Sequence, residues 1–266
     1  MSEQERQRPP ITVDNYQQVY EYFEDYCNDG KVLSFAYSAI NKILHPRISE
    51  NPQARLDAEH ITANNTPHIY IFNHLSKWDY FLFASYLHQK APGDIGNIRT
   101  MGADFNFRGP KISASEIQVG PLVDYIGAVP VFRSQDYPSV DLHPVQEELF
   151  NCVARSLVKG HKVAAAPEGK INVTENPMQL LKFRSGIAEV AMRASHMLDS
   201  EVAITPIGFC YKRDIHQLKN KGKNARIYVE QSVYATPDMT VPQITEAARE
   251  KLQQAAAVAY GLYTTH

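Results

Sequence analysis

Short apolar runs alternate with longer segments of helical periodicity from residue 68 to the end of the chain. The apolar runs predict strands near 68–73, 96–101, 127–132, 162–166, 202–208 and 225–233. The other segments predict helices near 78–89, 116–125, 142–159, 180–196 and 241–260. This alternation is typical of the α/β class, with a central, mainly parallel sheet flanked by helices on both faces. Because no helix separates the last two strands, we expect them to form an antiparallel pair at the sheet edge.

The first part of the chain precedes this alternation. Residues 1–12 are polar and predict a loose tail, and residues 15–44 predict two helices separated near Gly30. The second of these helices carries an apolar stripe at helical spacing, formed by Leu33, Ala36, Tyr37, Ile40, Ile43 and Leu44. Such a stripe favours a helix packed on the domain. The alternative is an interfacial helix dipping into lipid headgroups, with Lys31, Lys42 and His45 at its margins.

A polar linker is expected between this helical part and the first strand, from Pro46 to about Pro67. We therefore divide the chain into an N-terminal tail and helical extension, residues 1–50, and an α/β domain, residues 51–266.

Composition limits the possible partners and compartments. The chain has 27 lysines and arginines against 29 aspartates and glutamates, so it lacks the positive field of a nucleic-acid-binding protein. Its three cysteines are scattered, which supports neither a disulfide framework nor a zinc site and indicates a reducing compartment. The polar first ten residues are unlike a signal peptide, and no apolar run approaches the ~18–20 residues of a membrane span. We expect a cytoplasmic protein that at most lies on a membrane.

Two residues at the end of the first predicted strand suggest acid–base chemistry. His74 and Asp79 lie five positions apart in the segment NHLSKWD, residues 73–79. A neutral imidazole can accept a proton near pH 7, and a carboxylate on its other nitrogen fixes the tautomer and stabilises the imidazolium. The spacing suits a histidine in a turn and an aspartate in the first turn of a helix. By itself, such a pair is more often a helix-capping aspartate and a surface histidine, because a two-residue pattern recurs by chance.

Three later predicted strands also end in residues that suit a substrate site. The first of these three segments, GAVPVFR at 127–133, ends in Arg133. A guanidinium at a strand end can bind a phosphate through two hydrogen bonds. The segment ending in Glu168, Gly169 and Lys170 brings a carboxylate and a cation to a strand end. The strand VAITPIG, residues 202–208, is the last of the set. Since ligands of open α/β sheets bind outside the carboxyl ends of the strands, these residues are candidates for one site.

In this order the segments resemble the signatures of the glycerolipid acyltransferase family. NHLSKWD resembles NHxSxxD, GAVPVFR resembles GxxPVxR, PEGK at 167–170 resembles FPEGTR, and VAITPIG resembles VxPV. FRSG at 183–186 is similar to the FKxG stretch of that family. The match covers roughly residues 68–210, and its strength lies in the order and spacing of several blocks rather than in any single block.

The resemblance implies a glycerol-3-phosphate acyltransferase-like fold and an O-acyltransferase. His74 would be the general base that deprotonates an acceptor hydroxyl, and Asp79 would orient it. The acceptor would be glycerolipid-like, such as lysophosphatidate or glycerol 3-phosphate, and the donor an acyl-CoA or acyl carrier protein thioester. The acyl group would pass directly to the acceptor, with no metal or bound cofactor, and the absence of a GxSxG motif agrees with the lack of an acyl-enzyme. The substrate-binding positions that the resemblance implies are Ser76, Arg133, Glu168, Gly169 and Lys170; for Ser76 a helix cap or turn contact is an equal explanation.

The chain departs from the family pattern around the acceptor. Lys170 and Ile171 follow Gly169 where the family has threonine and arginine, so the motif arginine is missing. Phosphorylated and unphosphorylated acceptors both stay open, because a lysine supplies a charge but not a planar fork. Phe132 stands where an aspartate is common, and we expect it to make the approach to Arg133 more apolar.

Two further features concern possible partners. A basic segment follows the strand at 202–208 and contains Lys212, Arg213, Lys219, Lys221, Lys223 and Arg226. It is expected to be a solvated hairpin, the alternative being a docking patch for anionic lipid or acyl carrier protein. Trp78 is expected to pack against the core or to line an acyl or pantetheine channel.

Other functions compete with acyl transfer. His74 could activate water, which would make the protein a thioester hydrolase. The scaffold could also be a non-catalytic lipid-binding protein, although His74, Asp79 and Glu168 are all present. A metal site on these three residues lacks the usual HxH or HExxH spacing.

Overall fold

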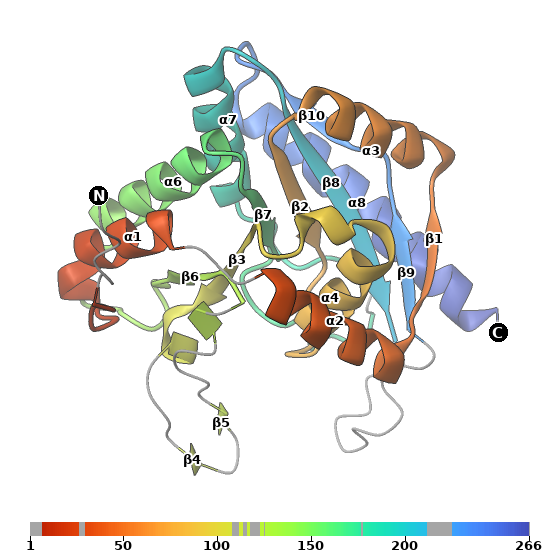
Figure 1. Cartoon of the computed structure of the whole chain (residues 1–266), viewed down its shortest axis with the longest axis horizontal. Coiled ribbons are helices and arrows are strands. Elements are labelled where there is room, and N and C mark those ends of the chain that lie inside the picture. The colour runs from red at the N-terminus through yellow and green to blue at the C-terminus, as the bar shows by residue number, and fades with distance from the viewer. Residues whose placement is uncertain are drawn as a thin grey trace.

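The computed structural model describes residues 7–26, 30–107, 112–113, 116–117, 123–124, 126–176, 178–211 and 225–265. Its main sheet has eight strands in the order β1-β9-β8-β2-β7-β3-β6, and β10 pairs with β8 beside this path (Figure 1). The strands of this sheet are β1 (Arg47–Glu50), β2 (His68–Phe72), β3 (Ile98–Ala103), β6 (Ala128–Val131), β7 (Lys162–Ala165), β8 (Val202–Cys210), β9 (Arg226–Val229) and β10 (Val233–Ala235). The short strands β4 (Ile112–Ser113) and β5 (Glu116–Ile117) form a separate pair.

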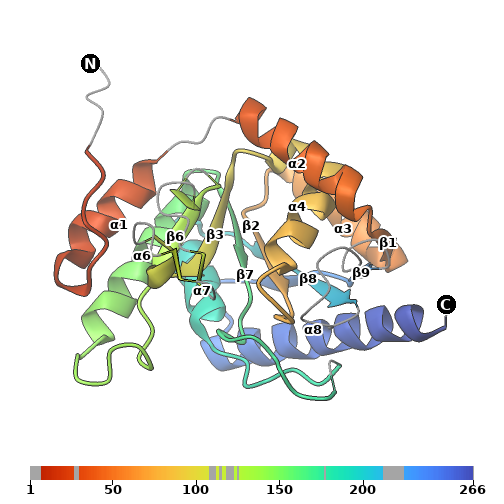
Figure 2. The same cartoon turned by 90° about the horizontal axis from the view of Figure 1, so that it is seen from below.

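Helices cover both faces of this sheet, as the α/β pattern predicts. They are α1 (Tyr16–Asp25), α2 (Gly30–Leu44), α3 (Pro52–Asn64), α4 (Asp79–Lys90), α6 (His143–Val158), α7 (Gly186–Leu198) and α8 (Val241–Thr264). In Figure 2 the sheet lies between α2, α3 and α4 on one side and α7 and α8 on the other. Within the described part of the chain, no helix is both long and apolar enough to span a membrane.

The direction of the strands brings the candidate residues to one edge. Five strand pairs of the sheet are parallel and two are antiparallel, β8 with β9 and β8 with β10. The strands β8, β2, β7, β3 and β6 therefore run the same way, and their carboxyl ends meet at the same edge of the sheet. The mainly parallel, mixed sheet expected from the sequence is confirmed.

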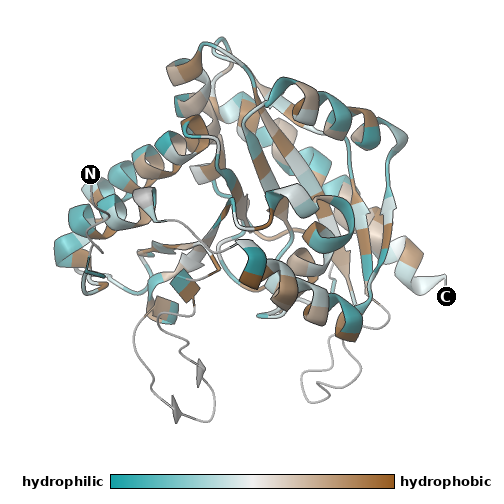
Figure 3. Ribbon diagram, viewed as in Figure 1, coloured by the Kyte–Doolittle hydropathy of each residue, from teal (hydrophilic) through white to brown (hydrophobic). Residues whose placement is uncertain are grey.

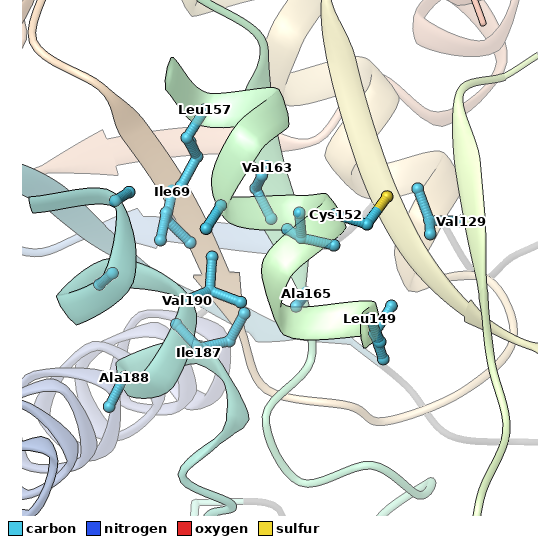
Figure 4. Close-up of a cluster of buried hydrophobic side chains, with 14 of the residues drawn as sticks. Ile69, Val129, Leu149, Cys152, Leu157, Val163, Ala165, Ile187, Ala188 and Val190 are labelled. Atoms are coloured by element: carbon cyan, nitrogen blue, oxygen red, sulfur yellow. The ribbon is translucent and has the colours of Figure 1, made fainter. Parts of the chain in front are cut away.

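Both faces of β2 are apolar because both are covered. Ile69 and Ile71 belong to the core beneath α1, α6, α7 and the first part of α8, which Figure 4 shows around Cys152. Tyr70 and Phe72 point to the opposite core, beneath α2 and α4. Figure 3 shows hydrophobic residues concentrated on the central strands, whereas the helices also carry hydrophilic positions. A strand with two buried faces reads as a continuous apolar run, which is why the sequence identified β2.

Helix α8 crosses β8 so closely that one position must be glycine. A Cβ added to Gly208 would lie 2.1 Å from the carbonyl oxygen of Ala255, which is far inside van der Waals contact. All nine residues of β8 are buried. The close crossing therefore fixes the last part of β8, from which the chain enters the site edge at Tyr211.

The polar linker expected at 46–67 is wrong, because this segment contains strand β1 and helix α3. Asn51 caps α3 by accepting a hydrogen bond from the Gln53 backbone N–H at 2.9 Å, and Pro52 occupies the first turn. β1 pairs in parallel with β9, and its exposed and half-buried residues hide this pairing from a hydropathy pattern. The predicted antiparallel pair is correct for β8 and β9, but β1 rather than β9 is the edge strand.

Other boundaries also differ. The strand expected over 225–233 is divided into β9 and β10. The helix expected at 180–196 begins only at Gly186, because the residues before it bind to the β7 end of the site. Of the helix expected at 116–125, residues 116–117 form β5 and residues 123–124 are helical, and the rest lies outside the described residues.

The N-terminal part packs on the domain. Residues 7–12 are not a loose tail, since Ile11 is buried and Arg8 forms an ion pair with the buried Asp124. In α2, Leu33 and Tyr37 are buried against the α4 side of the sheet, but Ile43 is 68% exposed, so the predicted stripe is only partly covered. The division after residue 50 stays a prediction, and β1 just before it is part of the sheet.

Candidate active site

The turn after β2 is fixed to β8 by its first residue. The Asn73 side chain accepts a hydrogen bond from the Phe209 N–H at 2.7 Å and donates one to the Phe209 carbonyl at 3.0 Å. These bonds continue the β2–β8 pairing past Phe72, where the backbone of the chain turns away. His74 therefore leaves the sheet in a defined direction.

His74 and Asp79 lie side by side, as their spacing predicts. His74 is in the turn and Asp79 is the first residue of α4. The His74 Nδ1 atom is 2.8 Å from Asp79 Oδ2. A carboxylate at this distance holds the proton on Nδ1, so Nε2 is the nitrogen left to accept a proton. The His74 side chain is 14% exposed, whereas that of Asp79 is fully buried.

The buried carboxylate of Asp79 is surrounded by donors. Oδ2 also accepts the backbone N–H groups of Leu75 at 2.7 Å and Ser76 at 2.9 Å. Oδ1 accepts the hydroxyl of Tyr211 at 2.5 Å. These bonds offset the cost of burying a charge and hold the carboxylate in one orientation toward His74.

Tyr211 is a site residue that the sequence analysis missed. It directly follows β8 and is buried. Its hydroxyl lies 2.6 Å from Ser76 Oγ and also donates to Asp79 Oδ1. Ser76 Oγ also accepts the Trp78 N–H at 3.0 Å, which is the turn contact considered for this serine. The position after an apolar strand was the only available signal for Tyr211. Its role depends on β8 pairing with β2, which no local pattern reveals.

Glu168 anchors the histidine turn to the end of β7. Its Oε1 accepts the His74 N–H at 2.8 Å and its Oε2 accepts the Leu181 N–H at 2.7 Å. The side chain is buried, and this burial raises the pKa of the carboxyl, while the bonds from His74 and Leu181 oppose the rise. The Asn172 N–H donates to the His74 carbonyl at 2.6 Å and adds a second link to the same turn. The geometry thus places Glu168 behind His74, with both of its oxygens engaged by backbone.

Arg133 lies two residues beyond the end of β6 and has an internal partner. Its Nε donates to Asp136 Oδ2 at 2.6 Å, and its guanidinium lies 5.2 Å from the centre of the Phe105 ring. Phe132 is buried in the core beside Tyr20, so the expected effect of Phe132 on the approach to Arg133 is wrong. Both residues lie beyond Val131, the last residue of β6; there Phe132 is buried and Arg133 is only half-buried.

Tyr80 connects the Arg133 and His74 parts of the site. Its ring centre is 6.1 Å from that of His74, and its hydroxyl donates to the Met101 carbonyl at 3.0 Å. Burial and the charge of Asp79 raise the pKa of Tyr80, and the charge of Arg133 lowers it. Tyr80 therefore lies close to both His74, which follows β2, and Arg133, which follows β6.

Two further residues considered in the sequence, Lys170 and Trp78, lie at the surface. Lys170 is exposed. Trp78 is 37% exposed and lies 5.1 Å from the ring of Phe81, which is 41% exposed, so the expected packing of Trp78 in the core is wrong. The basic segment falls at 212–224 outside the described residues, except that Arg226 lies in β9. Among the described residues, no group of three or more histidine, cysteine, aspartate or glutamate side chains is placed to hold a metal ion.

A comparison with known protein families gives a match. A family model described as Acyltransferase matches residues 53–210, which is more than half of the chain. The matched part runs from the start of α3 to the end of β8 and contains all the expected site residues. Tyr211 is the first residue beyond it. A search of curated proteins found no match.

Proposed function

The chain belongs to the Acyltransferase family, and from this premise we propose that it moves a fatty acyl group from a thioester to the hydroxyl of a glycerolipid-type acceptor. The observation that carries the proposal is the 2.8 Å contact between His74 Nδ1 and the buried Asp79 carboxylate. It supplies a base with a fixed tautomer at the carboxyl edge of the sheet. The donor is acyl-CoA or acyl carrier protein, and the acceptor is lysophosphatidate or glycerol 3-phosphate.

The reaction begins with the free nitrogen of His74. Nε2 takes the proton of the acceptor hydroxyl while the oxygen attacks the thioester carbonyl carbon. The C–S bond of the tetrahedral intermediate then breaks, and the imidazolium returns its proton to the departing thiolate sulfur. The negative charge of Asp79 stabilises the imidazolium between these steps. No covalent acyl-enzyme forms, so donor and acceptor must be bound together.

Each remaining residue has a role that follows from its position. Arg133 binds the acceptor from the β6 end, in exchange for its contact with Asp136. Glu168 and Gly169 shape the wall behind His74, and Ser76 supports Asp79 through Tyr211. The exposed pair Trp78 and Phe81, next to the dyad in sequence, offers apolar surface for an acyl chain or for peripheral contact with a membrane. We also propose a cytoplasmic location, because the scattered cysteines indicate a reducing compartment.

Hydrolysis is the second candidate, because the same nitrogen of His74 could activate water. The test is product analysis by mass spectrometry with one acyl-CoA and one acyl carrier protein, with and without acceptor. We expect the wild type to form acylated acceptor when acceptor is added and to release little free fatty acid without it. The acylated product should disappear in His74→Ala. Free fatty acid released equally fast without acceptor would contradict acyl transfer.

The matched control for this test is His60→Ala. His60 is a half-exposed histidine of α3 that pairs on the surface with Glu201, the residue before β8 and thus at the opposite edge of the sheet from the dyad. Its loss removes an imidazole and leaves the site unchanged, so activity should equal that of the wild type.

A further inference from the structure

The side chain of Arg184 packs against Gly169. Gly169 has a φ of +67°, in the left-handed region that favours glycine. A Cβ added there would lie 2.7 Å from Arg184 Nε, 3.0 Å from its Cδ and 3.6 Å from its Cζ. The guanidinium of Arg184 therefore lies directly against the Cα of Gly169. A glycine is required here both for the backbone angle and for the space that the arginine occupies.

The backbone around Arg184 is tied to the same structure that holds His74. The Arg184 N–H donates to the Pro167 carbonyl at 3.0 Å. Three residues earlier, the Leu181 N–H donates to one oxygen of Glu168, whose other oxygen accepts the His74 N–H. A single carboxylate thus links the segment that carries Arg184 to the turn that carries the base.

The charge of Arg184 is available to a ligand. Arg184 and Lys170, the residue that follows Gly169 in the chain, are exposed and make no side-chain hydrogen bond or ion pair with any residue that the structure describes. The nearby carboxylate of Glu168 is buried and engaged by two backbone groups. Arg133 differs, because its Nε is bound by Asp136. Two cations without an internal partner, beside the anchor of the base, attract an anion.

We propose that Arg184, seated on Gly169, binds a phosphate monoester of a substrate together with Lys170. This proposal rests on the acyl transfer proposed above. The planar guanidinium offers two parallel donors to phosphate oxygens, and Lys170 adds a point charge. Arg184 thereby compensates for the arginine missing after Lys170, from a segment that is distant in sequence. The phosphate is either that of the acceptor or the 3′-phosphate of coenzyme A.

Equilibrium binding separates the two sources without turnover. Isothermal titration calorimetry with glycerol 3-phosphate and with coenzyme A is applied to the wild type, Arg184→Gln and Arg184→Lys. We expect Arg184→Gln to weaken the binding of one of the two ligands by about ten- to a hundredfold, the usual effect of a charged hydrogen bond. Arg184→Lys should recover only part of this loss, because it keeps the charge but not the fork. A wild type that binds neither ligand, or an Arg184→Gln protein that binds both as tightly as the wild type, overturns the proposal.

The control is Arg55→Gln. Arg55 is an exposed arginine of α3 that forms an ion pair with Glu59 on its own helix, so its loss removes the same charge from a helix that contributes no residue to the site. Its affinities for both ligands should equal those of the wild type. Because Arg184 is exposed, Arg184→Gln should keep the wild-type melting temperature and circular dichroism spectrum.

Turnover distinguishes this proposal from the proposed function. If the acceptor is the source, Arg184→Gln raises the KM for a phosphorylated acceptor but not for monoacylglycerol. If the donor is the source, the KM rises for acyl-CoA but not for a phosphate-free acyl-pantetheine. If the wild type transfers no acyl group but binds a phosphate ligand that Arg184→Gln binds more weakly, the proposed function is refuted and the anion site is retained. Normal transfer with unchanged binding and KM in Arg184→Gln refutes only the anion site.

Discussion

The hydroxyl of Tyr211 lies 2.5 Å from Oδ1 of Asp79, opposite the oxygen that contacts His74. The two ends of the carboxylate are thus held by a residue of the turn after β2 and a residue at the end of β8. The orientation of the base therefore depends on the pairing of two strands and not on the local motif alone.

Tyr211→Phe tests this relationship. The change removes one donor to a fully buried carboxylate, so we expect the free energy of unfolding to fall by about 1–3 kcal/mol. We expect kcat to fall about five- to thirtyfold, because Asp79 is less well oriented. Urea denaturation and steady-state kinetics measure the two effects. Tyr228→Phe, at a half-buried tyrosine of β9, is the control and should change neither. Wild-type kcat in Tyr211→Phe would contradict a positioning role.

Asp79→Asn should disable the dyad at nearly constant volume. An amide presents an NH₂ group toward donors, and the two oxygens of Asp79 now accept four. We expect kcat to fall by about 10²–10⁴-fold, the range of general-base catalysis. His74→Ala should lose a similar amount, and the double variant should lose no more than either, because the residues act as a unit. Additive losses would show that Asp79 acts independently of His74.

Glu168→Gln should change how stability depends on pH. Burial raises the pKa of Glu168 above its ordinary value of 4.5, so the folded protein binds this proton more tightly than the unfolded chain. The stabilisation linked to that proton is fully present below pH 4.5 and is lost as the pH rises through the folded pKa. The stability of the wild type relative to Glu168→Gln should therefore decrease with rising pH across this window. Urea titrations at several pH values measure it, with Glu59→Gln on the surface as the control. A constant difference between the wild type and Glu168→Gln would contradict the raised pKa.

Asp136→Asn and Arg133→Gln should act in opposite directions. Asp136 is the internal counter-ion of Arg133, so its removal frees the guanidinium for an anionic acceptor. We expect the KM for a phosphorylated acceptor to fall a few-fold in Asp136→Asn and to rise about tenfold or more in Arg133→Gln. An unphosphorylated acceptor should show neither effect. Equal KM values for both variants and the wild type would remove Arg133 from the acceptor site.

The sequence alone determined the features that depend on neighbouring residues. Buried strands such as β2 read as apolar runs, and their alternation with helices predicted the α/β class. The dyad was predictable because His74 and Asp79 lie five positions apart across a strand end and a helix start. Such features need only local geometry and the rule that parallel strands end at one edge.

The tertiary structure decided everything that depends on contacts between distant segments. β1 is a polar edge strand, and only its pairing with β9 makes it part of the sheet. Glu168 fits an acceptor site by motif, but folding buries it between the N–H groups of His74 and Leu181. Tyr211 reaches Asp79 through β8, and no spacing in the chain identifies it. Arg184 belongs to the FRSG stretch, which the motifs do identify, but only folding shows that its side chain lies against Gly169. The physical reason is that hydropathy and spacing record the surroundings of each residue along the chain, whereas hydrogen-bond partners are chosen by the packing of the whole domain.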